Sequence, residues 1–210
     1  MERTQDGTPR IHEYGFIGDT RTGALVSPAG SIDWMCWPRF DSEPIFGRLI
    51  DAERGGRFEL TVVGARVVSR HYRNASAVLV TEWSGPLGEA RLTEAMIMNT
   101  RIPAVVRVLE CVRGQVEAHL CYAPRPGLPG RLAPAPFTLH TAPSLRLDAS
   151  GTWEGELAAG ERLSTLLSAR RSSMTHHVAA DLLGRTDRWW QRWCEEIHCG
   201  PRHRDVLIRS

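Results

Sequence analysis

Four thiol and imidazole side chains near the C-terminal end of the sequence have the chemistry of metal ligands: Cys194, His198, Cys199 and His203. A Cys and a His four residues apart on a helix share one face. Zinc sites, however, usually separate two close ligand pairs by a longer gap, whereas Gly200-Pro201 splits this set within one turn. We therefore expect no metal and no other cofactor.

A second cluster, between residues 33 and 41, combines aromatic rings with a guanidinium and carboxylates, which together suit sugar rings and hydroxyls. Trp34 and Trp37 lie at odd spacing on an expected strand, so one ring points inward and the other outward. Only the outward ring can stack on a ligand, and ordinary sandwich packing also explains the pair. The candidate sugar-binding residues are Trp37, Arg39 and Asp41.

Self-contained catalysis has little support in the sequence. Glu195 and Glu196 are neighbours on an expected helix and point about 100° apart, so they cannot flank one scissile bond as a paired acid and base. The sequence contains no nucleophile elbow, dinucleotide fingerprint or metalloprotease helix motif. All 26 basic residues are Arg, which excludes Lys-based chemistry within these 210 residues.

The elements that would position these side chains form three zones. From residue 14 to residue 56 we expect short strands at 15–18, 24–26 and 31–37, followed by a small helix that Ser42 caps and Gly55-Gly56 ends. From Arg57 to about Ala169 apolar residues alternate with polar ones, and turn signals separate the segments. This pattern predicts an antiparallel β-sandwich. The expected strands lie at 78–80, 90–92, 105–112, 116–122, 144–147 and 163–167.

The third zone is an amphipathic helix over residues 173–199. Val178, Leu182, Trp189, Trp193 and Ile197 recur at multiples of three to four residues. Several tryptophans on one helix need a large surface to bury against, as does the proline-rich loop between residues 124 and 136. We therefore expect an interface with another domain that uses four residues of this helix: Trp189, Trp190, Trp193 and Ile197.

Composition narrows the class of protein. With 42% hydrophobic residues, 24% charged residues and a formal net charge of +2, the chain has ordinary globular composition, and its scattered basic residues do not indicate a nucleic-acid partner. No apolar run reaches the length of a membrane span, and the polar segment 1–13 is expected to be a loose tail without an export signal. Five cysteines at irregular spacing favour free thiols and a cytoplasmic location.

Several segments in the first zone resemble the start of bacterial glycoside hydrolase family 15 proteins, the glucoamylase, glucodextranase and trehalase-like enzymes. The segments are Tyr14-Gly15-Phe16-Ile17-Gly18-Asp19, Gly30-Ser31-Ile32-Asp33-Trp34 and Pro38-Arg39-Phe40-Asp41-Ser42. The match continues to Gly55-Gly56, and it reappears at residues 189–193.

The resemblance implies a supersandwich-like N-terminal domain at residues 14–172, a linker helix at 173–199, and the start of an (α/α)6 catalytic barrel at 200–210. It also implies inverting hydrolysis of α-linked glucosides by two glutamates that lie beyond Ser210. The expected function is therefore that of a non-catalytic domain supporting a barrel, and the chain alone is expected to be inactive. Two alternatives stay open: a free-standing sugar-binding sandwich, and an inactive truncated product that associates with itself through its terminal helix.

Overall fold

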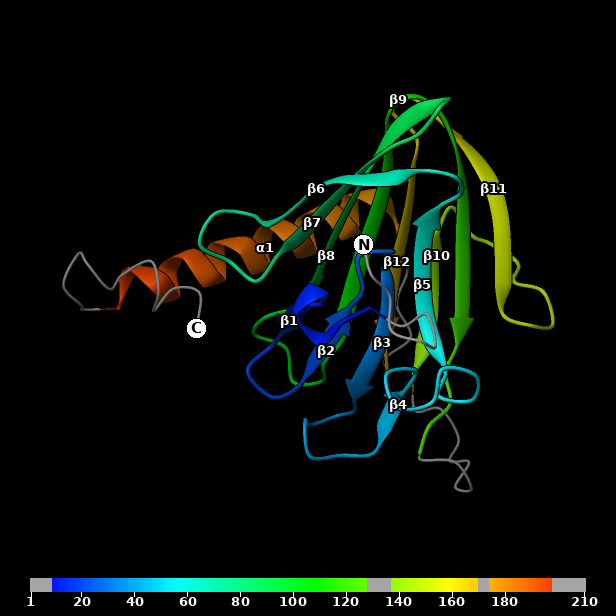
Figure 1. Cartoon of the computed structure of the whole chain (residues 1–210). Helices are drawn as coiled ribbons and strands as arrows, with labels where there is room; N and C mark the ends of the chain where they lie inside the picture. Colours follow the sequence, from blue (N-terminus) through cyan, green and yellow to red (C-terminus); the bar gives the residue numbers. More distant parts are fainter. Residues whose placement is uncertain (1–8, 128–136, 170–173, 198–210) are drawn as a thin grey trace.

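The fold is that of an antiparallel β-sandwich followed by one helix (Figure 1). The computed structural model describes residues 9–127, 137–169 and 174–197. Within these ranges the strands are β1 (Gly15–Gly18), β2 (Gly23–Val26), β3 (Ser31–Cys36), β4 (Pro44–Phe46), β5 (Arg57–Val62), β6 (Arg66–Tyr72), β7 (Leu79–Ser84), β8 (Gly88–Met96), β9 (Ala104–Ala123), β10 (Thr138–Ala142), β11 (Thr152–Ala158) and β12 (Arg162–Ser168). The predicted sandwich with a C-terminal helix is confirmed.

Strand β9 joins the two layers of the sandwich because each of its halves belongs to a different layer. Its first half, from residue 104 to 113, pairs with β8 on one side and β12 on the other. Its second half, from residue 115 to 123, pairs with β5 and β11. One layer therefore contains β6, β7, β8, β12 and β10, and the other contains β1, β2, β3, β5 and β11.

The change of layer occurs at Gly114, whose φ is +70°. Glycine adopts this left-handed conformation without the steric cost that other residues incur. The sequence predicted two strands separated by a turn at residues 113–115. The structure corrects this prediction, because one 20-residue strand continues through the bend.

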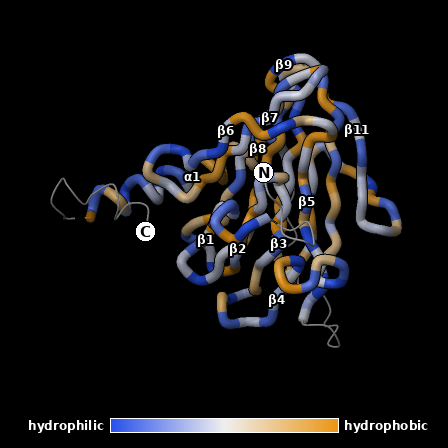
Figure 2. The backbone as a smooth tube through the Cα atoms, viewed as in Figure 1, coloured by the Kyte–Doolittle hydropathy of each residue, from blue (hydrophilic) through white to orange (hydrophobic). Residues whose placement is uncertain are grey.

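The main core fills the space between the two layers. It consists of inward-facing side chains such as Ile17, Phe58, Leu92, Leu109 and Leu120, each with 0% exposure. Alternation along the strands places polar residues on the opposite faces, and the backbone tube in Figure 2 accordingly changes repeatedly between blue and orange.

Arg107 and Glu94 form a buried ion pair inside this core, with 2.8 Å between Arg107 Nε and Glu94 Oε2. Both side chains are fully buried. The guanidinium also donates to the carbonyl oxygens of Phe58 and Gly30, which belong to the opposite layer. Burial of the charge is thus compensated by three hydrogen bonds, and the two to the Phe58 and Gly30 carbonyls connect the two layers.

The helix α1 (His176–Glu195) covers the outer face of the β8, β9 and β12 region. Thr175 caps it, since the Thr175 hydroxyl oxygen accepts a hydrogen bond from the Val178 backbone N–H. Ala179 and Leu183 pack in a second cluster with Val106 and Leu166. The described part of the predicted helix is therefore present, and residues 170–173 and 198–210 lie outside the described residues.

The prediction of a small helix after Ser42 is wrong. Residues 44–46 form β4 instead, which pairs with the end of β3 and buries all three of its side chains. The apolar pattern was interpreted as one helical face, but Ile50 is 66% exposed while Ile45 and Phe46 are buried. Pairing with β3 buries more of this segment than a single apolar stripe would, so tertiary packing decides its conformation.

The strand expected at 144–147 is also absent, and β10 ends just before it at Ala142. Leu145 and Leu147 are partly buried and pack against the core, so the alternation was real. Pro143 has no N–H to donate to a ladder, which is consistent with the end of pairing there. Among the described residues, no helix is long and apolar enough to cross a membrane.

Candidate functional site

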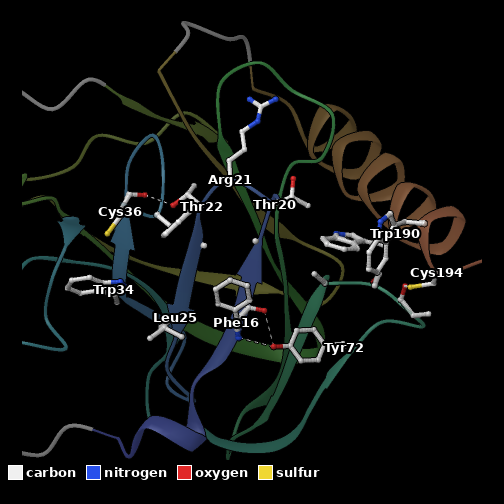
Figure 3. Close-up of a pocket in the computed structure, with 17 residues that line it drawn as sticks. Phe16, Thr20, Arg21, Thr22, Leu25, Trp34, Cys36, Tyr72, Trp190 and Cys194 are labelled. Carbon is white, nitrogen blue, oxygen red and sulfur yellow. Dashed lines mark hydrogen bonds between the residues drawn. The ribbon is translucent and has the colours of Figure 1, made fainter. Parts of the chain in front are cut away.

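A hollow of about 710 Å³ lies between the outer face of β1–β3 and the C-terminal end of α1 (Figure 3). Strand register builds its floor, because Phe16 of β1 pairs with Leu25 of β2, and Leu25 pairs with Trp34 of β3. These three side chains therefore form one row on the face of the sheet that points away from the core. We refer to them as the floor row.

Two glycines make room for the first ring of the floor row. A Cβ atom on Gly18 would lie 2.9 Å from the Phe16 ring, and one on Gly23 would approach that ring more closely still. The Phe16 ring thus lies over the backbone of the β1–β2 hairpin. Tyr72 fixes the strand beneath it, since its hydroxyl accepts from the Phe16 N–H at 2.8 Å and donates to the Phe16 carbonyl at 2.9 Å.

The wall opposite the floor row comes from α1 and the β6–β7 loop. Trp190 and Trp193 stack edge to face, with ring centroids 5.7 Å apart, and both line the hollow. The Cys194 thiol contacts the Ala75 carbonyl oxygen at 3.5 Å, which attaches the helix end to the loop. Phe40 completes the rim with a side chain that is 73% exposed.

The described lining of the hollow is suited to recognition of apolar groups. Arg21 is the only charged residue among the described lining residues, and its guanidinium already donates to the Arg101 carbonyl at 2.8 Å. No Asp, Glu or His lines it in the described part of the chain, and no cluster of metal-binding side chains occurs there. Trp193 and Phe16 remain 43% and 55% exposed.

The four residues expected to form a domain interface lie near this hollow in different ways. Trp190 and Trp193 line it directly, whereas Trp189 borders a smaller neighbouring hollow against residues 19–21 and 97–100. Ile197 is half-buried just beyond the helix end. The structure adds the floor row and the β6–β7 loop to this surface. The sequence signal for the outward ring of Phe16 is the presence of glycines at positions 15 and 18, since a ring can lie over residues without side chains.

The three candidate sugar-binding residues are not brought together. The ring of Trp37 packs against Phe137 at 5.7 Å between centroids and is 6% exposed, so it offers no stacking face. Arg39 and Asp41 form an exposed ion pair at 3.0 Å, and the Arg39 hydrogen bond lowers the pKa of the Asp41 carboxyl. Of Trp34 and Trp37, Trp34 has the partly exposed ring, and it belongs to the floor row.

Asp33, the other carboxylate of that cluster, serves the fold. It is 1% exposed and accepts hydrogen bonds from the hydroxyls of Tyr14 and Ser31, while Arg48 lies 3.7 Å away. Burial, together with the charge of Asp33, raises the pKa of the Tyr14 hydroxyl above its usual range. Tyr14, Ser31 and Asp33 therefore bond to one another inside the fold.

Of the four side chains weighed as metal ligands, only Cys194 is described, and it is buried beside Ala75. His198, Cys199 and His203 lie outside the described residues. The four described cysteines are buried and form no disulfide with one another, which agrees with the expectation of no disulfide framework: Cys36, Cys111, Cys121 and Cys194.

Comparison with known proteins decides the family. The family described as "Trehalase-like, N-terminal" matches residues 4–146, which is more than half of the chain. The chain belongs to the trehalase-like N-terminal domain family. This domain includes all of the segments on which the resemblance rested, apart from residues 189–193 of α1.

Curated relatives place this trehalase-like domain within longer proteins. A trehalase of Mycolicibacterium smegmatis is 28% identical over 231 aligned positions, which cover 88% of this chain and 34% of that protein. A trehalase of Mycobacterium tuberculosis is 32% identical over 136 positions, covering 55% of the chain and 20% of that protein. A trehalase of Thermoplasma volcanium is 39% identical over 82 positions, which cover 38% of the chain and 13% of that protein.

The chain thus spans about a third of the length of the first of these relatives. No solved structure gives a significant match. The family match and these partial matches identify the chain as a trehalase-like N-terminal domain.

Proposed function

We propose that this domain supports an (α/α)6 barrel that hydrolyses α-linked glucosides, and that the aromatic hollow beside α1 is part of the surface on which the barrel packs. The observation that carries the proposal is the exposed aromatic surface formed by the floor row, Phe40 and Trp193. Contiguous exposed apolar patches on soluble domains mark interaction sites. The resemblance to family 15 enzymes supplies the nature of the partner.

The division of labour follows from the chemistry of the two parts. Inverting hydrolysis needs two carboxyl groups across a scissile bond with room for a water between them. The hollow has aromatic rings and no lining carboxylate among its described residues, so its contribution is binding energy and position. The domain would hold the barrel's elements in place, and trehalose, maltooligosaccharides or dextran would be cut in the barrel.

A pull-down tests this function. The tagged chain is mixed with polypeptides that comprise the parts of the Mycolicibacterium smegmatis and Mycobacterium tuberculosis trehalases outside the regions that match this chain. Retention is measured for the unmodified chain and for Trp193→Asp. Val112→Asp is the matched control, because Val112 and Trp193 are both 43% exposed. We expect Trp193→Asp to abolish retention while Val112→Asp leaves it unchanged. Failure of the unmodified chain to retain any such polypeptide would refute the packing role.

A second candidate function, sugar binding, is favoured by the exposed Arg39 and Asp41 that flank the exposed ring of Phe40. The aromatic face offers a surface on which a sugar ring can stack, and the guanidinium and carboxylate can hydrogen-bond its hydroxyls. Titration of the chain with trehalose or maltose, followed by tryptophan fluorescence, tests it. Sugar binding predicts a saturable change that Arg39→Ala and Phe40→Ala remove, whereas a purely packing role predicts no response.

We also propose a cytoplasmic location. It is supported by the four described cysteines, which are buried and form no disulfide with one another, since disulfides are rare in reducing compartments. Self-association of an inactive product is the remaining alternative. Light scattering over a concentration series separates it from the packing role, which predicts that Trp193→Asp does not alter the oligomeric state of the isolated chain.

A further inference from the structure

We propose that the hollow beside α1 receives a segment of this same chain, Val206-Leu207-Ile208, and that this segment is the first contact between the domain and the barrel. The inference rests on the proposed packing role and specifies the occupant of the hollow. Residues 198–210 lie outside the described residues, so the support comes from the hollow itself and from the chain length between the hollow and this segment.

The character of the hollow favours an aliphatic occupant. Its floor row and the rings of Trp190, Trp193 and Phe40 present mainly apolar surface. Removal of such surface from water is the dominant favourable term in most association. A sugar would bury several hydroxyls against a lining with few hydrogen-bonding groups, and unmatched hydroxyls are costly. Val206-Leu207-Ile208 is the apolar run of the chain beyond α1.

The connection is long enough for the segment to reach the hollow. Ile197 is the last described residue, and it comes shortly after Trp193 and Cys194, which line the hollow. Val206 lies nine positions after Ile197, and an extended chain spans about 3.3–3.6 Å per residue, so the reach is about 30 Å. A tether this short gives an effective concentration of about millimolar, and a weak contact is then sufficient.

Hydrogen exchange measured by mass spectrometry tests the proposal on the 210-residue chain. Four forms are compared: the unmodified chain, Leu207→Asp, the chain ending at Ile197, and Ser210→Asp, which adds the same charge to the same segment outside the apolar run. We expect exchange in the peptides spanning residues 20–23 and 75–77 to be about tenfold faster in Leu207→Asp and in the shortened chain. Ser210→Asp should match the unmodified chain.

A pair of variants on the side of the hollow completes the test. Phe40→Asp should speed the exchange of residues 205–208, whereas Leu87→Asp should not, because Leu87 is similarly exposed, at 78% against 73%, but does not line the hollow. Peptides from β9 report that each variant stays folded. Since Phe40 and Leu87 are surface residues, we expect β9 exchange to be unchanged.

Three results would overturn the proposal. Equal exchange in all four forms would show that the segment does not occupy the hollow. Protection that grows with protein concentration would assign the hollow to a second copy of the chain, and protection that appears only with added trehalose or maltose would assign it to a sugar. In each case the pull-down on Trp193→Asp still decides the packing role separately.

Discussion

Asp33 accepts hydrogen bonds from two hydroxyls while remaining 1% exposed, and this makes it the centre of the polar contacts in the N-terminal strands. Tyr14 comes from the residue before β1, Ser31 begins β3, and Arg48 lies in the turns after β4. One carboxylate therefore connects three segments that are separated in sequence. A buried carboxylate in such a position is stabilising only while its donors remain in place.

Replacing Tyr14 by Phe tests this cluster through its pH dependence. The pKa of the Tyr14 hydroxyl is raised in the folded state. Its contribution to the free energy of unfolding is therefore complete below the pKa of about 10 that tyrosine has in the unfolded chain, and it is lost as the pH rises toward the pKa of the folded state. We expect Tyr14→Phe to lower the free energy of unfolding at pH 7 by about 1 kcal/mol and to weaken its fall above pH 10. Urea titrations at pH 7 and pH 10.5 measure both effects. An unchanged alkaline slope would contradict this account of Tyr14.

At the residue scale, the sequence predicted which residues are candidates for binding better than it predicted where their side chains point. The odd spacing of Trp34 and Trp37 correctly implied one inward and one outward ring, but the choice between them depends on which side of β3 faces the core. Trp37 packs on Phe137, a residue a hundred positions away, and no local pattern contains that contact. The floor row of Phe16, Leu25 and Trp34 likewise depends on register between strands.

Strand β9 organises the elements, since its two halves are central strands of the two layers and Arg107 extends from it to the opposite layer. Local alternation indicated both halves. The continuity between them was missed because a glycine with turn residues on either side also begins a hairpin. Whether a chain bends or reverses at Gly114 is decided by its neighbours β8 and β11, which pair with it on either side of the bend.

Glu94→Gln should destabilise the domain by about 3–5 kcal/mol, because it leaves the fully buried Arg107 charge without its counter-ion. Glu82→Gln is the matched control. Glu82 pairs with Arg91 at 3.0 Å at a partly exposed site, so its loss should cost less than about 1 kcal/mol. Chemical denaturation of the two variants gives both values. Similar costs for the two substitutions would show that Glu94 does not compensate the buried Arg107 charge.

Gly114→Ala tests the bend of β9. The new Cβ would require a left-handed conformation and would meet the Leu87 carbonyl oxygen. Gly64→Ala shares the left-handed conformation, at φ +67°, but its Cβ would meet nothing within 4 Å. We expect about 1–2 kcal/mol of destabilisation for Gly64→Ala from the backbone alone, and a larger loss for Gly114→Ala. Thermal unfolding of both variants checks the order, and the reverse order would contradict the close approach at the bend.

For the whole molecule, the sequence was sufficient to predict a sandwich followed by a helix, since alternation and helical periodicity are both local signals. The hollow was predicted only in part. The helix spacing indicated Trp190 and Trp193, but the floor row from β1–β3 and the β6–β7 loop beside the helix are brought together with them by tertiary contacts alone. The apolar hollow is the feature of the fold that most directly suggests a partner.

The most direct measurement is the hydrolysis of trehalose and maltose by three kinds of protein: the chain alone, the chain joined to the part of the Mycolicibacterium smegmatis trehalase outside the region that it matches, and that longer polypeptide with Trp193→Asp or Val112→Asp. A supporting, non-catalytic domain predicts no hydrolysis by the chain alone, hydrolysis by the longer polypeptide, a strong loss with Trp193→Asp and none with Val112→Asp. Hydrolysis by the 210-residue chain itself, or full activity of Trp193→Asp, would contradict it.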